Sequence, residues 1–251
     1  MLGLGARAAA AEPRRVLRAL VEDWPPYLEA DGKGRMRGLD AELLEAIGAE
    51  AGYAVEWVRE PAELRKRRYL EFMDDRFDVI FSATPVRANA EIAMYTAPYR
   101  SEVMKVAAAQ PHDARLDSLR GFDDLLAHGI HLLHVQATGL GRDFEAHRER
   151  LAAAGLLIPY PTTRQGIEML RIGRAPLILG DALDLGAQAR LAGVTLVRQP
   201  YGHSAESVSL MLSRKRLNDG DLARIDRAIH ALERRGALNA IRHRYERAQM
   251  S

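Results

Sequence analysis

The sequence predicts an α/β protein of two lobes, each built on a mostly parallel sheet flanked by helices. Strand-like and helix-like segments alternate along the chain, which is the pattern of parallel βαβ units. The alternation occurs twice in similar order, on either side of a connecting segment at residues 95–110. A chain of 251 residues is long enough for one large domain or two small ones with a sizeable core.

The first block starts with a strand-like segment at residues 14–23. The next segment, "WPPY", cannot be helical because of its two prolines, and "ADGKGRMRG" is typical of a turn or hairpin. The segment "LDAELLEAIGAEAG" has apolar residues at helical spacing, with Asp40 placed to cap its start and Gly52 to end it. The rest of this block is predicted as a strand at 53–58, a helix at 61–75 with Pro61 in its first turn, and a strand at 77–83.

The second block repeats this order, and a third piece closes the chain. Thr162 and Gln165 have the spacing of a capping box at the start of one predicted helix. The second block is predicted as strand 129–136, helix 141–155, strand 156–160, helix 162–173, strand 175–180, helix 182–193 and strand 194–199. The third piece is predicted as strand 207–214, helix 221–236 and helix 237–248.

Composition excludes several classes of function. The formal net charge is only +2, so bulk charge implies no nucleic-acid partner, and the basic run "RKRR" is interpreted as a solvated helix face. The chain has no cysteine and no stretch of apolar residues long enough to span a membrane. Residues 1–13 are Ala-rich and are interpreted as the remnant of a secretory signal peptide, with a disordered leader as the alternative.

Polar residues that follow predicted strands are the candidates for a ligand site, because parallel sheets bind ligands beyond the carboxyl ends of their strands. Arg87 ends "DVIFSATPVR" and could hold a carboxylate in its planar fork of donors, with Ser82 and Thr84 adding hydroxyl groups. The alternative is a surface ion pair of Arg87 with Glu91. Asp181, which follows "LILG", either caps the next helix or binds a ligand ammonium group.

Two further segments are candidates with open alternatives. Trp24 and Tyr27 of "EDWPPY" either stack on a ligand or pack within their lobe. Thr138 and Gly139 of "QATGLGRDF" either help to bind an anion at the start of a helix or belong to a plain helix entry. The single G-x-G of this segment does not satisfy the dinucleotide fingerprint, and the scattered histidines do not favour a metal site. No catalytic motif is found, and no cofactor is expected.

Taken in order, several stretches resemble the family 3 periplasmic solute-binding proteins of ABC transporters, with the two-lobed type 2 fold. These stretches cover nearly everything after residue 14 and are "LVEDWPPY", "GLDAELLEAIGAEAGYAVEWV", "FDVIFSATPVR", "YTAPYRSEVMKVAA", "GIHLLHVQATG", "MLRIGRAPLILGD" and "AIHALERRGALNAIRHRY". The resemblance implies a discontinuous lobe 1 (residues 14–101 and 203–251) and a lobe 2 (residues 102–202).

The resemblance also implies roles for single residues. In the amino-acid binders of this family an arginine in a "T-P-E-R"-like turn holds the ligand carboxylate, and "TPVR" supplies Arg87. An aspartate after a strand of the second lobe holds the amino group, which matches Asp181, and an aromatic before two prolines packs on the ligand, which matches Trp24. The segment between Asp78 and Arg87 is shorter than in the family pattern, and the first strand lacks the aspartate near Val21 that binders of basic amino acids carry.

The expected function is therefore that of a non-catalytic periplasmic protein that captures an amino acid or another small carboxylate and presents it to an ABC transporter permease. A monomer is expected. The alternatives are a periplasmic enzyme of the same fold, such as a dehydratase, and a sensor or degenerate module that binds no small molecule.

Overall fold

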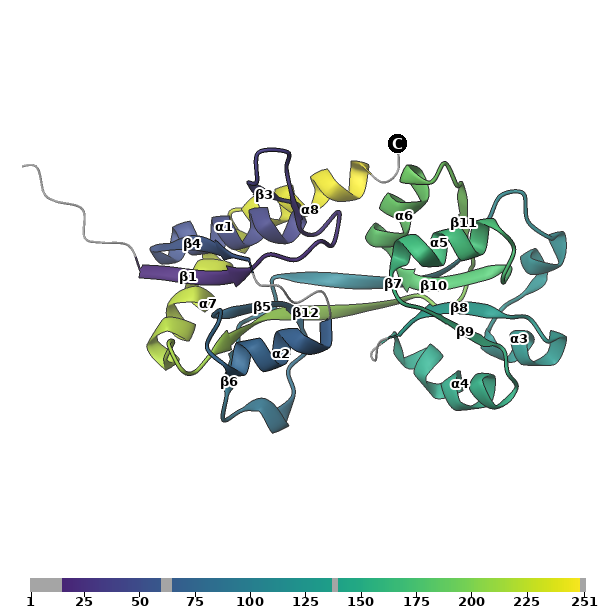
Figure 1. The fold of residues 1–251 in the computed structure, drawn as a ribbon, viewed down its shortest axis with the longest axis horizontal. Coiled ribbons are helices and arrows are strands. Elements are labelled where there is room, and N and C mark those ends of the chain that lie inside the picture. Colours follow the sequence, from purple (N-terminus) through teal and green to yellow (C-terminus); the bar gives the residue numbers. More distant parts are fainter. Residues whose placement is uncertain (1–14, 60–64, 137–139, 249–251) are drawn as a thin grey trace, which may run out of the picture.

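The computed structural model describes residues 15–59, 65–136 and 140–248, and it confirms the predicted two-lobed α/β fold (Figure 1). Lobe 1 contains β1 (Arg15–Leu20), β2 (Glu29–Ala30), β3 (Met36–Arg37), α1 (Leu39–Ala51), β4 (Tyr53–Val58), α2 (Arg65–Met73), β5 (Val79–Ala83), the 3-10 helix η1 (Arg87–Asn89), β6 (Ala93–Tyr95), α7 (Asp219–Arg234) and α8 (Ala237–Ala248). Lobe 2 contains the 3-10 helix η2 (Ala114–Ser118), α3 (Phe122–His128), β8 (Leu132–Val135), α4 (Arg142–Ala153), β9 (Leu157–Tyr160), α5 (Thr163–Arg171), β10 (Leu177–Asp181), α6 (Ala182–Leu191) and β11 (Leu196–Arg198). Two long strands, β7 (Arg100–Ala109) and β12 (Ser204–Ser213), run between the lobes.

One continuous sheet passes through both lobes in the described part of the chain. Its strand order is β4-β1-β5-β12-β7-β10-β8-β9, with β6 paired to β12 and β11 paired to β7. The strands β4, β1 and β5 are parallel in lobe 1, and β9, β8 and β10 are parallel in lobe 2. The antiparallel ladder between β7 and β12 joins these two parallel sets.

Each lobe has apolar side chains on both faces of its part of the sheet. In β5, Val79 belongs to the cluster under α1 and α7, whereas Ile80 belongs to the cluster with Phe72 of α2. In β10, Leu179 and Ile178 divide in the same way between two clusters of lobe 2. This alternation follows from the period of two along a strand, and burial on both faces is typical of parallel sheets.

Most of the predicted elements are found. The predicted hairpin forms between β2 and β3, Gly52 ends α1 in the left-handed region at φ 82°, and Thr162 accepts the backbone N–H of Gln165 as a cap of α5. The prediction that Asp40 caps α1 is wrong. Gly38 occupies the cap position at φ 117°, and a Cβ there would lie 2.4 Å from the carbonyl oxygen of Tyr27.

The predicted lobe boundaries fall at the β7–β12 ladder, and their positions stay predictions. Residues 100–104 of β7 pair with residues 204–208 of β12, and β7 then continues into lobe 2, where it pairs with β10 and β11. Because both strands belong to both lobes, a boundary can be drawn at any point along the ladder. The interpretation of residues 1–13 as a leader lies outside the described residues.

No helix in the described segments has both the length and the apolar character needed to cross a membrane. The same segments contain no group of three or more His, Cys, Asp or Glu side chains placed to hold a metal ion.

Candidate functional site

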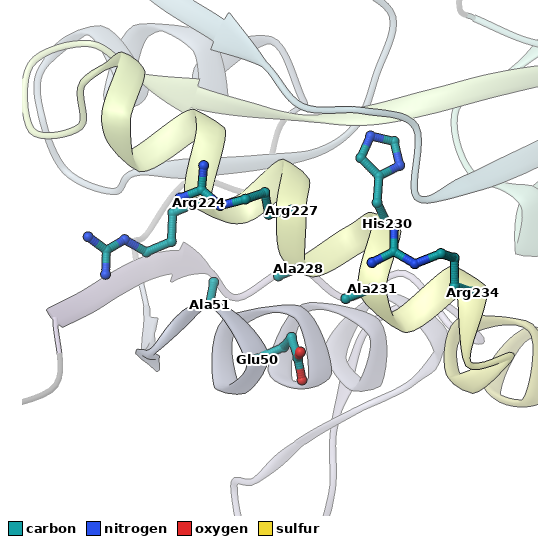
Figure 2. Close-up of a pocket in the computed structure, with 8 residues that line it drawn as sticks. All are labelled: Glu50, Ala51, Arg224, Arg227, Ala228, His230, Ala231 and Arg234. Carbon is teal, nitrogen blue, oxygen red and sulfur yellow. The ribbon is translucent and has the colours of Figure 1, made fainter.

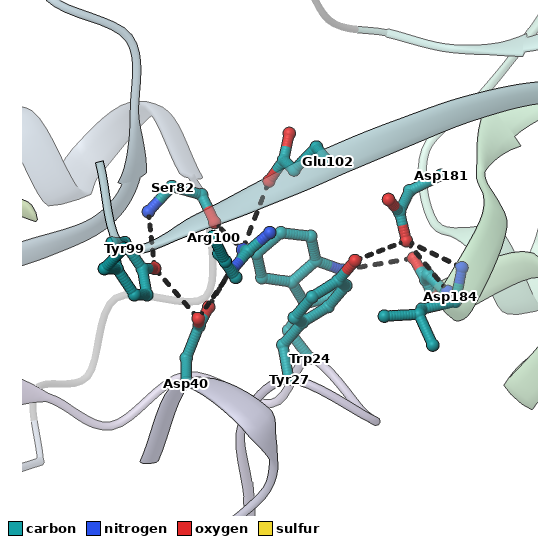
Figure 3. A network of polar contacts seen from close by, with 10 residues as sticks. Trp24, Tyr27, Asp40, Ser82, Tyr99, Arg100, Glu102, Asp181 and Asp184 are labelled. Carbon is teal, nitrogen blue, oxygen red and sulfur yellow. Dashed lines mark hydrogen bonds and ion pairs between the residues drawn. The ribbon is translucent and has the colours of Figure 1, made fainter. Parts of the chain in front are cut away.

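A buried ion pair lies where β7 leaves lobe 1 (Figure 3). Arg100, the first residue of β7, donates from Nε to Oδ1 of Asp40 at 2.7 Å and from Nη2 to Oδ2 at 3.0 Å. Tyr99 donates its hydroxyl to Oδ1 of Asp40 at 2.8 Å. Asp40 lies in the first turn of α1, where the helix dipole favours a negative charge. Burial lowers the pKa of Arg100, but Asp40, Tyr99 and Tyr27 together raise it by more, so the guanidinium remains charged.

The remaining contacts of Arg100 leave one of its nitrogens without a partner. Nη2 also donates to Oγ of Ser82, and to Oε1 of Glu102 at 3.3 Å. Ser82 has a positive φ of 53°, at the point where the pairing of β5 with β12 shifts register, and this bulge brings its hydroxyl to Arg100. Nη1 of Arg100 is buried and has no hydrogen-bond partner. An unpaired buried donor costs about 1–3 kcal/mol, and more when it is charged.

Tyr27 lies between Arg100 and lobe 2. Its ring covers the guanidinium, with 4.2 Å between Cζ of Arg100 and the ring centre. Its hydroxyl donates to Oδ1 of Asp181 in lobe 2 at 2.7 Å. Burial raises the pKa of Tyr27 well above its ordinary value, so the hydroxyl keeps the proton that it donates. The backbone of Tyr27 is held against α1, since the amide of Asp40 donates to its carbonyl oxygen at 2.8 Å.

Asp181 is the last residue of β10 and the cap of α6. Its Oδ1 accepts the backbone N–H groups of Leu183 at 3.1 Å and Asp184 at 3.0 Å, in addition to the hydroxyl of Tyr27. Its other oxygen, Oδ2, is buried without any hydrogen-bond partner. Burial raises the pKa of Asp181 to about 6, and the nearby charge of Glu102 acts in the same direction. Asp181 therefore caps α6 through Oδ1, while Oδ2 can still accept a hydrogen bond.

A second contact joins the same two segments. The indole Nε1 of Trp24 donates to Oδ2 of Asp184 at 3.1 Å, and Thr163 of α5 donates its hydroxyl to the same oxygen. The rings of Trp24 and Tyr27 lie 4.5 Å apart. One turn of lobe 1 thus presents two aromatic donors to two acids at the start of α6 (Figure 3).

Four predicted ligand-binding residues lie where the two lobes face each other, namely Trp24, Tyr27, Ser82 and Asp181. Thr84 and Arg87 are exposed, and Arg87 belongs to η1, a helix of three residues. The alternative ion pair between Arg87 and Glu91 does not form among the described residues. Thr138 and Gly139 lie outside the described residues. The role of each in ligand binding stays a prediction.

Sequence reasoning missed Arg100, Asp40, Glu102 and Asp184 as members of this cluster. Asp40 was interpreted as a helix cap, and Arg100 stands in the connecting segment without a motif around it. A charged residue directly after "TAPY", at the start of a strand, is the signal that could have indicated Arg100.

Two grooves open elsewhere, on lobe 1. One, of about 430 Å³, lies between the end of α1 and α7 (Figure 2), and its walls include Arg224, Arg227 and Arg234. The other, of about 550 Å³, lies beside Trp57. The acid of the first groove, Glu50, is paired with Arg235 at 2.7 Å. None of the side chains lining either groove has a buried polar atom without a partner, in contrast to Arg100 and Asp181.

Two α/β lobes joined by a ladder of two strands, with polar groups of both lobes facing each other, define a type 2 periplasmic binding fold. The chain belongs to the bacterial extracellular solute-binding proteins, family 3, whose family model matches residues 17–248. No curated protein sequence matches the chain.

Solved structures share this fold at low sequence identity. An ancestral arginine-binding protein bound to glutamine is 20% identical, with a TM-score of 0.68, over 93% of this chain and 98% of that chain. A histidine kinase sensor domain with similarity to periplasmic binding proteins is 20% identical, with a TM-score of 0.67, over 92% and 95% of the two chains. The ancestral amino acid-binding protein AncCDT-1, a precursor of cyclohexadienyl dehydratase, is 16% identical, with a TM-score of 0.67, over 92% and 94%.

Proposed function

We propose that this chain is an extracytoplasmic solute-binding protein that captures a small polar, carboxylate-bearing ligand between its lobes. The observation that carries the proposal is Asp181, a buried carboxylate of lobe 2 that faces Tyr27 of lobe 1 and has one oxygen unpaired. A ligand that supplies a donor to this oxygen gains a charge-assisted hydrogen bond. An amino acid or a related compound has such a donor in its ammonium group.

Ligand capture would proceed by a shift between open and closed forms. The contacts of Tyr27 with Asp181 and of Trp24 with Asp184 exist only when the lobes are close, so they belong to the closed form. A ligand that contacts both lobes stabilises that form by its differential affinity. The ladder of β7 and β12 is the segment about which the lobes would move.

The family supports a proposal for the partner and the location. Its description as extracellular supports a periplasmic location. We propose that the closed form is presented to the permease of an ABC transporter and that the protein acts as a monomer. We place lobe 1 at residues 14–101 and 203–251, and lobe 2 at residues 102–202.

A thermal-shift screen followed by small-angle X-ray scattering tests the proposal. Amino acids, opines and small carboxylates are added separately, and we expect at least one class to raise the melting temperature. The same compound is expected to decrease the radius of gyration, because the lobes close. Stabilisation without compaction would contradict capture between the lobes. A complete absence of stabilising compounds would favour a sensor or degenerate module instead.

A catalytic role is the second candidate, and one observation favours it. A general acid needs a carboxyl group that keeps its proton near neutral pH, and burial raises the pKa of Asp181 to about 6. A dehydratase of this fold would use such a group to protonate a leaving hydroxyl. Incubation with carboxylated ring compounds and analysis by NMR decides the point. Product formation that is lost in Asp181→Asn would establish the enzyme, and recovery of unchanged ligand would support the binding protein.

A further inference from the structure

Two arginines could supply the positive charge that a ligand carboxylate needs, and they differ in their surroundings. Arg87 is exposed on the short helix η1, and residues 84–86 before it are exposed as well. Arg100 is buried at the junction of lobe 1 and β7, with its side chain 1% exposed. Ser82, predicted to assist Arg87, accepts a hydrogen bond from Arg100 instead.

The hydrogen bonds of Arg100 leave one direction open. The edge formed by Nε and Nη2 is occupied by Asp40, and Nη2 also contacts Ser82 and Glu102. Nη1 is buried and keeps its donors unpaired. Figure 3 shows the guanidinium between Asp40 on one side and Tyr27 with Asp181 on the other. A carboxylate in contact with Nη1 would therefore lie within the cluster that joins the two lobes.

The charges around Arg100 limit what the ligand can carry. The charge of Arg100 is balanced by Asp40, and Glu102, Asp181 and Asp184 lie in the same cluster. A ligand with two carboxylates would place its second negative charge among these acids. A ligand with one carboxylate and one cationic group would match Nη1 of Arg100 with the first and Oδ2 of Asp181 with the second.

We propose that Arg100, and not Arg87, is the anion-binding residue of this protein, and that it selects ligands with a single carboxylate and a cationic group. The inference rests on the proposed function, since it assumes that the ligand binds between the lobes. It assigns a specificity-determining role to a residue of the strand that connects the lobes. Nη1 can bind a carboxylate without loss of the ion pair with Asp40, because Asp40 uses a different edge of the guanidinium.

Substitutions at three arginines separate this role from a structural one. Arg100→Lys keeps a positive charge next to Asp40 but removes Nη1. If this variant folds poorly, the double variant Asp40→Asn, Arg100→Gln takes its place, because it replaces the ion pair with an uncharged pair. Arg235→Lys is the structural control, because Arg235 forms an ion pair with Glu50 at the end of α1, away from the lobe junction. Arg87→Ala removes the exposed guanidinium. Circular dichroism and melting temperature confirm that each variant is folded.

Isothermal titration calorimetry of these variants tests the inference. The probes are the neutral α-amino acids and γ-aminobutyrate, with putrescine and succinate as the diamine and dicarboxylate of the same length as γ-aminobutyrate. We expect an amino carboxylate to bind to the wild type and the Arg100 variants to weaken this binding roughly tenfold or more. Arg87→Ala and Arg235→Lys are expected to bind as the wild type does.

Three results would overturn the inference. The first is that Arg87→Ala no longer binds the amino carboxylate while the Arg100 variants still bind it. The second is that the protein binds succinate more tightly than the amino carboxylates. The third is that the protein binds none of the probes. If a different compound then raises the melting temperature and decreases the radius of gyration, the proposed function stands and only this inference fails. If no compound of any class does so, both fail.

Discussion

Two buried aspartates, Asp181 in lobe 2 and Asp221 in lobe 1, occupy similar positions and differ in their partners, since Asp221 also forms an ion pair, with Arg15. Each lies at the start of a helix, and each accepts a tyrosine hydroxyl at 2.7 Å, from Tyr27 and Tyr53 respectively. Asp221 has partners on both oxygens, because Oδ2 accepts the backbone N–H of Asn218 at 3.0 Å. Asp181 has all its partners on Oδ1 and none on Oδ2.

The difference appears in the pKa values. Burial raises the pKa of Asp221, but its hydrogen bonds from Tyr53 and Asn218, with the charge of Arg15, lower it by more. Burial also raises the pKa of Asp181, and there the hydrogen bonds do not compensate, so the value reaches about 6. The fold satisfies both oxygens of Asp221 but leaves one oxygen of Asp181 without a partner, which is what we expect of a carboxylate that binds a ligand.

The largest expected effect is on ligand affinity, which we expect to depend on Asp181 and not on Asp221. Asp181→Asn keeps an oxygen for the cap of α6 but loses the negative charge, so we expect ligand affinity to fall by about 2–5 kcal/mol, which is thirtyfold or more. Asp221→Asn places an amide against Asn218 or Arg15, so we expect a loss of about 1–3 kcal/mol in stability with affinity unchanged. Calorimetry and urea unfolding of both variants provide the measurements. Equal ligand affinities in the two variants would contradict the assignment of ligand binding to Asp181 alone.

The next effect is on stability as a function of pH. The pKa of Asp181 rises from 3.8 to about 6 on folding, so the folded protein binds more protons than the unfolded chain between these values. Its contribution to stability is present below about pH 4 and is lost as the pH rises through 6. The difference in unfolding free energy between wild type and Asp181→Asn should therefore change by about 2–3 kcal/mol between pH 4 and pH 7.

The contribution of Asp221 to stability depends on pH in the opposite direction. Its pKa is lowered on folding, so its contribution is present above its ordinary value and is lost only as the pH falls through the folded value. Between pH 4 and pH 7 we expect a nearly constant difference between wild type and Asp221→Asn in urea unfolding. Parallel curves for wild type and Asp181→Asn over this range would mean that Asp181 is not buried with an unpaired oxygen.

The smallest effect concerns the two tyrosines. Tyr27→Phe removes a hydrogen bond between the lobes, and Tyr53→Phe removes one within lobe 1, each worth about 1 kcal/mol. We expect Tyr53→Phe to lower the unfolding free energy and leave the radius of gyration unchanged. Tyr27→Phe should increase the radius of gyration in the absence of ligand, as measured by small-angle scattering. An unchanged radius in Tyr27→Phe would argue against its role in closure.

The sequence was sufficient for most of the fold because helices and strands follow from local spacing. The apolar period of α1, the left-handed Gly52 at its end and the cap at Thr162 all depend on residues within a few positions of each other. The position of Asp181 after a buried strand also made it a candidate before its contacts were known.

The candidate site was harder to predict because its contacts join distant parts of the chain. Arg100 and Asp40 are sixty residues apart, and the ion pair between them gives Asp40 a role other than the predicted cap. The raised pKa of Asp181 depends on its burial in the folded protein, which local patterns do not reveal. The resemblance of "TPVR" to a family motif predicts a ligand-binding role for Arg87, which lies in an exposed turn, and this role stays a prediction.

The fluorescence of Trp24 tests the central claim, that ligand binds between the lobes, most directly. The chain has two tryptophans, and Trp57→Phe leaves Trp24, whose indole contacts Asp184 across the lobes, as the single reporter. We expect a saturable change in its emission on titration with the stabilising ligand, with the dissociation constant found by calorimetry, and no such change in the same variant carrying Asp181→Asn. Heat of binding without any change in the emission of Trp24 would contradict the account.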